Sequence, residues 1–243
     1  MENTFKNNYR VSSYVIDRNM NINLSTVMGI LQDIANDHCE ALNADRWSLL
    51  KSSNAFWVTT KVKLQINELP QMRQDFVAET WCIKNSAVKF ERDSKFFNDD
   101  KVFLTATSEW VAIDASSHRI RPAKTIAFPF DMQCREDRAI DGDFSKMNYQ
   151  IEEENRKYSR KILSSDIDVN NHVNNCFYAR FVLDCFDNEF LSKHKLKTYE
   201  THFINEAHEG EQLDFYVKKF DEDFYVEARA EDKVVIKTLL KFE

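Results

Sequence analysis

The densest group of reactive side chains lies in the run DIDVNNHVNN at 166–175, which contains two aspartates, four asparagines and one histidine. Asp168, Asn170 and His172 alternate within this run. In an extended loop, alternate side chains point to the same side, so these three are expected to converge. An apolar run follows directly, and a helix is predicted to begin there. The loop is therefore a candidate catalytic site at a helix N-terminus.

A helix N-terminus also offers unpaired backbone N–H groups, which can bind an oxygen as negative charge develops on it. Val173 and Asn174 supply the candidate N–H groups for this role. No G-x-S-x-G motif is present, and three glycines in the whole chain are too few for a phosphate-binding loop. The pattern favours an oxyanion-binding arrangement that works without a serine nucleophile.

A hydrolytic reaction also needs a base to activate water, and Glu206 is the candidate. It lies at the end of the first strand predicted after the helix, and a sheet that wraps this helix would bring Glu206 back to His172. A general base there would contribute roughly two to four orders of magnitude in rate. From the residues alone two other interpretations stay open, because Asp/Asn-rich loops often only cap helices and strand-end glutamates are often only solvated.

Cysteines and histidines give little indication of other chemistry. The chain has five cysteines and no C-x-x-C pair, which fits reduced thiols better than a disulfide set or a zinc knuckle. Cys176 and Cys185 fall on the apolar face of the predicted helix and are expected to pack in the core. His38, His202 and His208 lack ligand-like spacing to acidic or cysteine partners. We therefore expect neither a metal nor another cofactor.

Composition limits the class of partner. With 40 acidic and 33 basic residues the formal net charge is −7, which argues against broad binding to nucleic acid or anionic membranes. No apolar window approaches the roughly 18 residues of a membrane span, and MENTFKNNYR does not resemble a secretory leader. A soluble, cytoplasmic protein is expected. The basic clusters at 118–124 and 193–197 are the candidate contacts for an acidic partner.

Periodicity predicts the elements that would position the site. The first half is expected to hold a strand at 9–17, a helix from near Ser25 as N-cap, and strands at 57–66, 75–84, 88–97 and 102–113. The residues predicted on the buried helix face are Leu24, Val27, Met28, Leu31, Ile34 and Ala35. Those predicted to share one face of the first long strand are Val58, Thr60, Val62, Leu64 and Ile66.

The segment 129–156 has mixed charge and little periodicity, and is expected to be a linker that crosses the surface. The same order of elements then returns. The predicted second set is a strand at 158–163, a helix at about 174–190, and strands at 198–206, 212–220, 223–230 and 233–242.

Short sequence motifs recur at matching places in the two halves. INELPQMRQDF at 66–76 corresponds to INEAHEGEQLDF at 204–215, and MNINLS at 20–25 occupies the place of VNNHVN at 169–174. Two repeats of this length indicate tandem α+β domains, each a long helix wrapped by a curved antiparallel sheet. Glutamate is present in both copies, whereas histidine is present only in the second, so function is expected in the C-terminal half.

The run SDIDVNNHVNNCFY at 165–178, followed by FINEAHEG at 203–210, resembles the signature of the acyl-ACP thioesterases. The likeness continues through YRVSSYVIDRNMNINLSTVMGILQDIANDH, FWVTTKVKLQINELP and ATSEWVAID in the first half. This resemblance implies a double hotdog fold. The expected units are an N-terminal hotdog at 1–128 that houses the acyl chain, a linker at 129–156, and a catalytic hotdog at 157–243.

The resemblance assigns catalytic roles to Asp168, Asn170, His172 and Glu206. Some relatives carry a cysteine directly after the glutamate, but this chain has Ala207, which disfavours a covalent cysteine intermediate. We expect Glu206, with His172, to activate water, Asn170 to position the water or thioester, and Asp168 to fix the loop.

The implied substrate is acyl carrier protein carrying a phosphopantetheine-linked fatty acyl chain. The alternatives are an acyl-CoA thioesterase and a non-catalytic acyl-thioester sensor. Met28, Leu31 and Ile34 are candidates to contact the acyl chain, although each also fits a core position. Hotdogs pair, and two halves in one chain satisfy this requirement internally, so both a monomer and a homodimer are compatible with the sequence.

Overall fold

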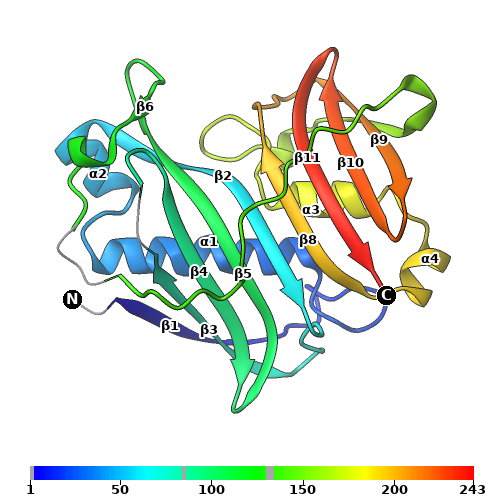
Figure 1. Cartoon of the computed structure of the whole chain (residues 1–243), viewed down its shortest axis with the longest axis horizontal. Coiled ribbons are helices and arrows are strands. Elements are labelled where there is room, and N and C mark those ends of the chain that lie inside the picture. The colour runs from blue at the N-terminus through cyan, green and yellow to red at the C-terminus, as the bar shows by residue number, and fades with distance from the viewer. Residues whose placement is uncertain (1–2, 84–85, 130–133) are drawn as a thin grey trace.

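The structure is a computed structural model that describes residues 3–83, 86–129 and 134–243. Its strands join into one continuous antiparallel sheet, with the helices packed behind it (Figure 1). The first half contains β1 (Thr4–Arg10), α1 (Leu24–Ala41), α2 (Arg46–Ser53), β2 (Ala55–Ile66), β3 (Asp75–Cys82), β4 (Phe90–Asn98), β5 (Lys101–Asp114) and β6 (Ile120–Arg121). The second contains β7 (Arg156–Lys161), α3 (Phe177–Leu183), α4 (Asn188–Lys193), β8 (Leu196–Phe203), β9 (Gln212–Phe220), β10 (Asp223–Ala230) and β11 (Lys233–Phe242).

The strand order reveals the internal repeat. It runs β1-β3-β4-β5-β2 and then β8-β11-β10-β9-β7, so each strand on this path has its counterpart at the mirrored place in the other half, and among the described strands only the short β6 lies off it. The halves join where β2 pairs with β8. Each half is thus a helix wrapped by antiparallel strands, which confirms the predicted α+β tandem hotdog.

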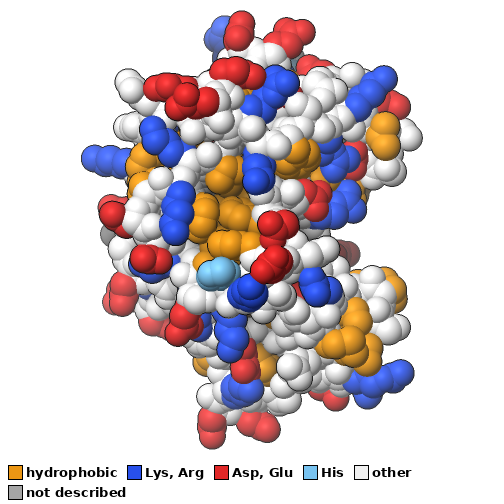
Figure 2. Space-filling view, turned by 90° about the vertical axis from the view of Figure 1, so that its right-hand side faces the viewer, with side chains coloured by type: hydrophobic (Ala, Val, Ile, Leu, Met, Phe, Trp, Pro, Cys, Tyr) orange, Lys and Arg blue, Asp and Glu red, His pale blue; other side chains and the backbone are white. Residues whose placement is uncertain are grey.

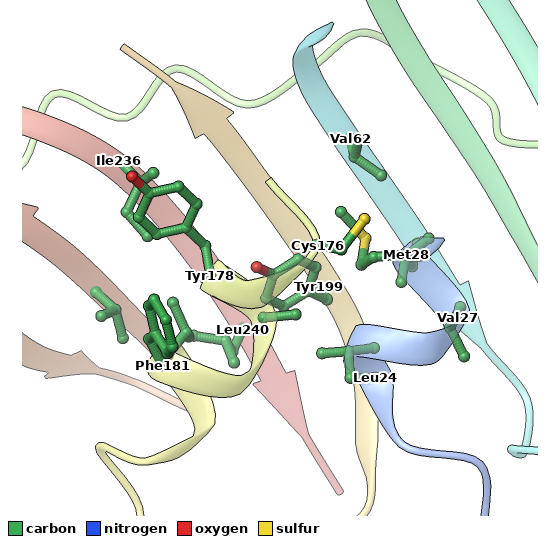
Figure 3. Packing of buried hydrophobic residues seen from close by; sticks show 14 of the residues in the cluster. Leu24, Val27, Met28, Val62, Cys176, Tyr178, Phe181, Tyr199, Ile236 and Leu240 are labelled. Atoms are coloured by element: carbon green, nitrogen blue, oxygen red, sulfur yellow. The ribbon is translucent and has the colours of Figure 1, made fainter. Parts of the chain in front are cut away.

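The two central helices meet behind the junction between the halves. Apolar side chains of α1 and α3 pack there, with Met28 and Cys176 facing each other in the close-up (Figure 3). Helix α1 buries Leu24, Val27, Met28, Ile34 and Ala35, in agreement with the predicted face. Its N-cap is Asn23, whose side chain accepts the Thr26 N–H, so the prediction of Ser25 was wrong by two residues.

Most predicted bounds differ from the observed ones by a few residues, but two elements differ more. The first strand occupies Thr4–Arg10 rather than 9–17, because the polar segment TFKNNYR pairs with β3. The helix expected at 174–190 is divided into α3 and α4, because the Asp187 side chain accepts the Phe190 N–H and starts a new helix.

A β-bulge changes which side chains of β2 point inward. Thr59 pairs with Trp110 and Lys61 with Glu109, so Thr60 is the extra residue and the alternation shifts by one. Thr60 bonds Glu109 on the outer face, whereas Thr59 contributes to an interior cavity. The prediction that Val58 and Thr60 share a face with Val62, Leu64 and Ile66 was therefore wrong, while the last three do share one buried face.

The described part of the inter-domain segment crosses the outer face of the sheet and is anchored to both halves (Figure 1). The Ala139 N–H donates to Asp93 Oδ2 of β4 at 2.7 Å, and the Ser145 N–H donates to Glu200 Oε1 of β8 at 2.6 Å. These bonds satisfy buried carboxylates that would otherwise be costly to desolvate.

Charges of both signs are interspersed on the side of the molecule shown in Figure 2, with hydrophobic side chains near its centre. Within the described ranges, every helix is too short or too polar to cross a lipid bilayer.

Candidate active site

The loop before α3 is shaped by hydrogen bonds to Asp168. Its Oδ1 accepts the Asn170 N–H at 2.7 Å and its Oδ2 accepts from Asn170 Nδ2 at 3.3 Å. Its own N–H donates to the His172 carbonyl at 2.9 Å. Asn171 at the tip has a φ of 65°, a left-handed conformation that asparagine tolerates better than most residues. Asp168 thus fixes both Asn170 and the backbone on either side of His172.

The structure brings His172 and Glu206 together, as predicted. His172 Nε2 lies 3.1 Å from Glu206 Oε2, although 34 positions separate the residues in sequence. The Val173 N–H donates to the Ala207 carbonyl at 2.9 Å, which ties the loop to the segment after β8. Lys233 Nζ donates to the Glu206 carbonyl at 2.8 Å. The pair is accessible to solvent, with 27% of the His172 side chain and 61% of the Glu206 side chain exposed.

His208 also belongs to this cluster, which its spacing in the sequence did not predict. Its ring lies edge-on to that of His172 with the centroids 4.9 Å apart. Its Nδ1 lies 3.2 Å from the Asn171 carbonyl, so the neutral tautomer that donates from Nδ1 leaves Nε2 as an acceptor. Ligand atoms of His172, Glu206 and His208 lie within 4.8 Å of one another. Two imidazoles and a carboxylate are donors that a zinc ion accepts.

The proposed oxyanion role of Val173 and Asn174 does not fit the geometry. The Val173 N–H is bonded to Ala207, and the Asn174 N–H donates to the Asp166 carbonyl at 2.9 Å. The reason is that α3 begins only at Phe177, so these residues lie in the loop rather than in the first helical turn. The next backbone N–H, that of Asn175, has no hydrogen-bond partner within the described part of the chain.

Two cavities lie along α1, and we call them the near and far cavities according to their distance along the helix from α3. The near cavity spans about 390 Å³ and the far cavity about 400 Å³ of space that is partly open to solvent. The near cavity is lined by Met28, Leu31, Gln32, Thr59, Val62, Ser94, Ala106, Ser108, Trp110, Asn175, Cys176 and Phe203. The far cavity is lined by Ala35, Asn36, Cys39, Trp57, Cys82, Phe90, Glu91, Arg92, Trp110 and Phe128.

The near cavity adjoins the candidate catalytic loop along the chain. Asn175 and Cys176 follow His172 closely, and Phe203 ends the strand that leads to Glu206. Of the three residues predicted to contact an acyl chain, Met28 and Leu31 line this cavity, whereas Ile34 lies in the core with no exposed surface.

Gln32 was not predicted to line the site, because a polar residue on an amphipathic helix is normally expected to face solvent. Its Oε1 lies 3.7 Å from Cys176 Sγ, so the amide reaches across the junction between the halves.

Cys176 is poorly suited to be a nucleophile. Burial raises the pKa of its thiol to about 12, so the thiolate is scarce near neutral pH. Burial likewise raises the pKa of Cys185 to about 12. Ala207, which follows the glutamate, has no exposed surface and no reactive group. Neither Cys176 nor Ala207 therefore supplies a reactive thiolate.

Comparisons with known families agree with this arrangement. Residues 2–125 match the acyl-ACP thioesterase N-terminal domain, and residues 145–241 match the acyl-ACP thioesterase C-terminal domain. The chain belongs to the acyl-ACP thioesterase family.

Among curated members of this family, it is 24% identical over 236 residues to the chloroplastic oleoyl-acyl carrier protein thioesterase of Coriandrum sativum, covering 90% of this chain and 64% of that one. It is also 24% identical to the chloroplastic oleoyl-acyl carrier protein thioesterase 2 of Arabidopsis thaliana, covering 87% of this chain and 62% of that one. The chain thus spans slightly less than two thirds of the length of these relatives.

Solved structures show the same fold. An acyl-ACP thioesterase from Bacteroides thetaiotaomicron superposes with a TM-score of 0.91 at 21% identity, covering 99% of this chain and 98% of that one. The 12:0-ACP thioesterase from Umbellularia californica superposes with a TM-score of 0.81 at 14% identity, covering 99% of this chain and 94% of that one. The tandem hotdog is therefore the architecture of thioesterase family members that share little sequence with this chain.

Proposed function

We propose that this protein hydrolyses the thioester of fatty acyl-acyl carrier protein, releasing free fatty acid and carrier protein. The observation that carries this proposal is the His172–Glu206 contact of 3.1 Å, next to the loop residues Asn175 and Cys176 that line the near cavity. Family membership and the near cavity beside α1 support the same conclusion. The pair supplies a base and the cavity supplies room for an acyl chain.

In the proposed reaction, a water oxygen attacks the thioester carbonyl carbon while its proton passes to the carboxylate of Glu206, which His172 orients. The tetrahedral intermediate then collapses, the C–S bond breaks, and the departing pantetheine sulfur takes up the proton. Cys176 remains a buried thiol throughout, so no acyl-enzyme forms. General base catalysis of this kind contributes about 10²- to 10⁴-fold in rate.

The developing oxyanion needs hydrogen-bond donors other than Val173 and Asn174, because both N–H groups are occupied. The Asn175 N–H and the side-chain amide of Gln32 are better placed, since both residues line the near cavity. Removal of one such donor costs about 10²- to 10³-fold in kcat in other hydrolases. Gln32 belongs to the first half, so this assignment makes both halves contribute to the reaction.

Release of free fatty acid from acyl carrier protein and from matched acyl-CoA substrates tests the proposal. The wild type is compared with Glu206→Ala and with Glu68→Ala, which removes the corresponding glutamate of the first half. We expect turnover on the carrier protein that collapses only in Glu206→Ala. Equal use of acyl-CoA would indicate the acyl-CoA thioesterase instead, and tight binding without turnover would indicate a sensor.

A further inference from the structure

Trp110 of β5 lines both cavities and so lies between them. Helix α1 contributes Met28 and Leu31 to the near cavity and Ala35 and Cys39 to the far cavity, one helical turn after another. From residue 28 to residue 39 the helix advances about 16 Å. The two cavities therefore form one row along α1, interrupted at the indole of Trp110.

The local structure holds this indole in place. Its Nε1–H donates to Ser108 Oγ at 2.8 Å, and Ser108 itself lines the near cavity. Opposite Trp110, the β-bulge at Thr60 turns Thr59 toward the near cavity. Bulges commonly redirect side chains in this way. Trp110 is thus a positioned barrier rather than a loosely packed surface side chain.

The far cavity suits an apolar chain but has a polar end. Trp57 packs edge-on against Phe90 and Phe128, with ring centroids 4.7 and 5.9 Å away. Beyond these rings the buried guanidinium of Arg92 lies 2.8 Å from His38 Nδ1 and also donates to Thr80 Oγ1 at 3.3 Å. Methylene groups would be stabilised by contact with the rings, whereas a chain that broke the hydrogen bonds of Arg92 would leave a buried charge unpaired.

We propose that Trp110 determines the acyl chain length that this protein accepts. The chain ends against the indole in the near cavity, and the far cavity accepts further methylene groups only when the indole is removed or displaced. This inference rests on the proposed thioesterase function for its substrate. The geometric part, one row of two cavities divided by one side chain, does not depend on turnover.

The test compares wild type, Trp110→Ala and Trp110→Phe on saturated acyl carrier proteins of medium and long chain. Each additional buried methylene strengthens binding about fourfold, so we expect the long-to-medium ratio of kcat/KM to rise by at least about tenfold in Trp110→Ala. Trp110→Phe keeps a ring and should shift the ratio less in the same direction, which preserves the test if the alanine variant is unstable. Trp47→Ala is the matched control, because Trp47 is 75% exposed on α2 and lines neither cavity.

Binding separates this inference from the proposed function. Displacement of a fluorescent fatty acid by medium- and long-chain saturated fatty acids gives the same ratio without turnover. If the long-to-medium ratio of affinities shifts in the variants but the wild type hydrolyses no substrate, the role of Trp110 is supported and the proposed thioesterase function is refuted. An unchanged ratio in both assays, in variants that melt as folded proteins, would overturn the role of Trp110.

Discussion

The loops that precede the two central helices share a backbone but differ in one decisive side chain. Asp17 Oδ1 accepts the Asn19 N–H at 2.8 Å, as Asp168 Oδ1 accepts that of Asn170 at 2.7 Å. The Asp17 N–H bonds the Asn21 carbonyl, as that of Asp168 bonds the His172 carbonyl. The counterpart of His172 is therefore Asn21.

This correspondence corrects the repeat drawn from the sequence, which placed Asn23 rather than Asn21 opposite His172. Met20 and Asn171 both have a φ of 65°, which fixes the register two residues away from that alignment. The Asp-x-Asn pattern is thus a loop-building feature present in both halves. Only the second half has a histidine at this loop position.

The interiors of the halves differ in a complementary way. In the first half, α1 is an 18-residue helix with two cavities along it, whereas α3 has 7 residues. Large aromatic side chains fill the second half, and those without exposed surface are Tyr199, Phe181, Phe215 and Tyr225. The first half also has fully buried aromatic side chains, Phe96 and Phe103, so the halves differ mainly in the two cavities along α1.

The largest expected effect comes from making the second loop like the first. His172→Asn places at this site the residue that the first half has there. We expect kcat/KM to fall about 10²- to 10⁴-fold, because the His172–Glu206 pair that serves as the base is lost. The melting temperature should change little, since His172 is partly exposed. Steady-state hydrolysis and thermal unfolding measure the two quantities.

Asn21→His is the reciprocal control for this change. It adds an imidazole to the first half, which lacks the other proposed catalytic residues, and should leave kcat/KM at the wild-type value. If His172→Asn retained wild-type kcat/KM, histidine would not be the functional difference between the halves.

The difference between a filled and a hollow interior predicts unequal costs of truncation. Phe181→Ala opens a cavity in a closely packed region and should lower the free energy of unfolding by about 3–5 kcal/mol. Leu31→Ala enlarges an existing cavity beside a partly exposed helix face and should cost about 1 kcal/mol. Urea denaturation measures both values. Equal costs would show that the first half is no less tightly packed.

The shared loop predicts that one substitution has different consequences in the two halves. Asp168→Ala releases Asn170 and the backbone around His172, so kcat/KM should fall about 10- to 100-fold through misplacement of the catalytic pair. Asp17→Ala removes the equivalent bond and should cost about 1 kcal/mol of stability with the rate retained. Comparable losses of rate in both variants would instead indicate that the first loop also shapes the active site.

The sequence predicted the elements that alternate clearly and missed those that depend on distant contacts. Strands β9, β10 and β11 have the predicted bounds, because their apolar and polar residues alternate along a half-buried sheet. The polar β1 carries no such pattern. The cavities could not be predicted either, because they depend on the single extra residue Thr60 and on where Trp110 meets Thr59 across the sheet.

For the site, the recurring Ile-Asn-Glu motif and the family resemblance indicated Glu206. The structure has the predicted contact between Glu206 and His172. His208 and Gln32 required coordinates, since their proximity arises from loop closure and from the meeting of two helices.

The smallest expected effect concerns Glu200, at the strand pair that joins the halves. Lys63 of β2 lies opposite it in register with Nζ 3.4 Å away, and Ser145 Oγ donates to it at 2.9 Å. Burial alone would raise the pKa of Glu200, but hydrogen bonds from His202 and Ser145 and the charge of Lys63 hold it below the ordinary value.

A pKa that is lower in the folded than in the unfolded state means that protons bind the unfolded chain more readily. The contribution of Glu200 to stability is therefore complete above an unfolded pKa of about 4.3 and is lost as the pH falls toward the folded value. Glu200→Gln should lower the melting temperature at neutral pH and flatten its decline in acid, whereas the exposed Glu222→Gln should leave both unchanged. If the melting temperature of Glu200→Gln declined with pH in parallel with that of wild type throughout the acid range, Glu200 would not contribute to the pH dependence of stability.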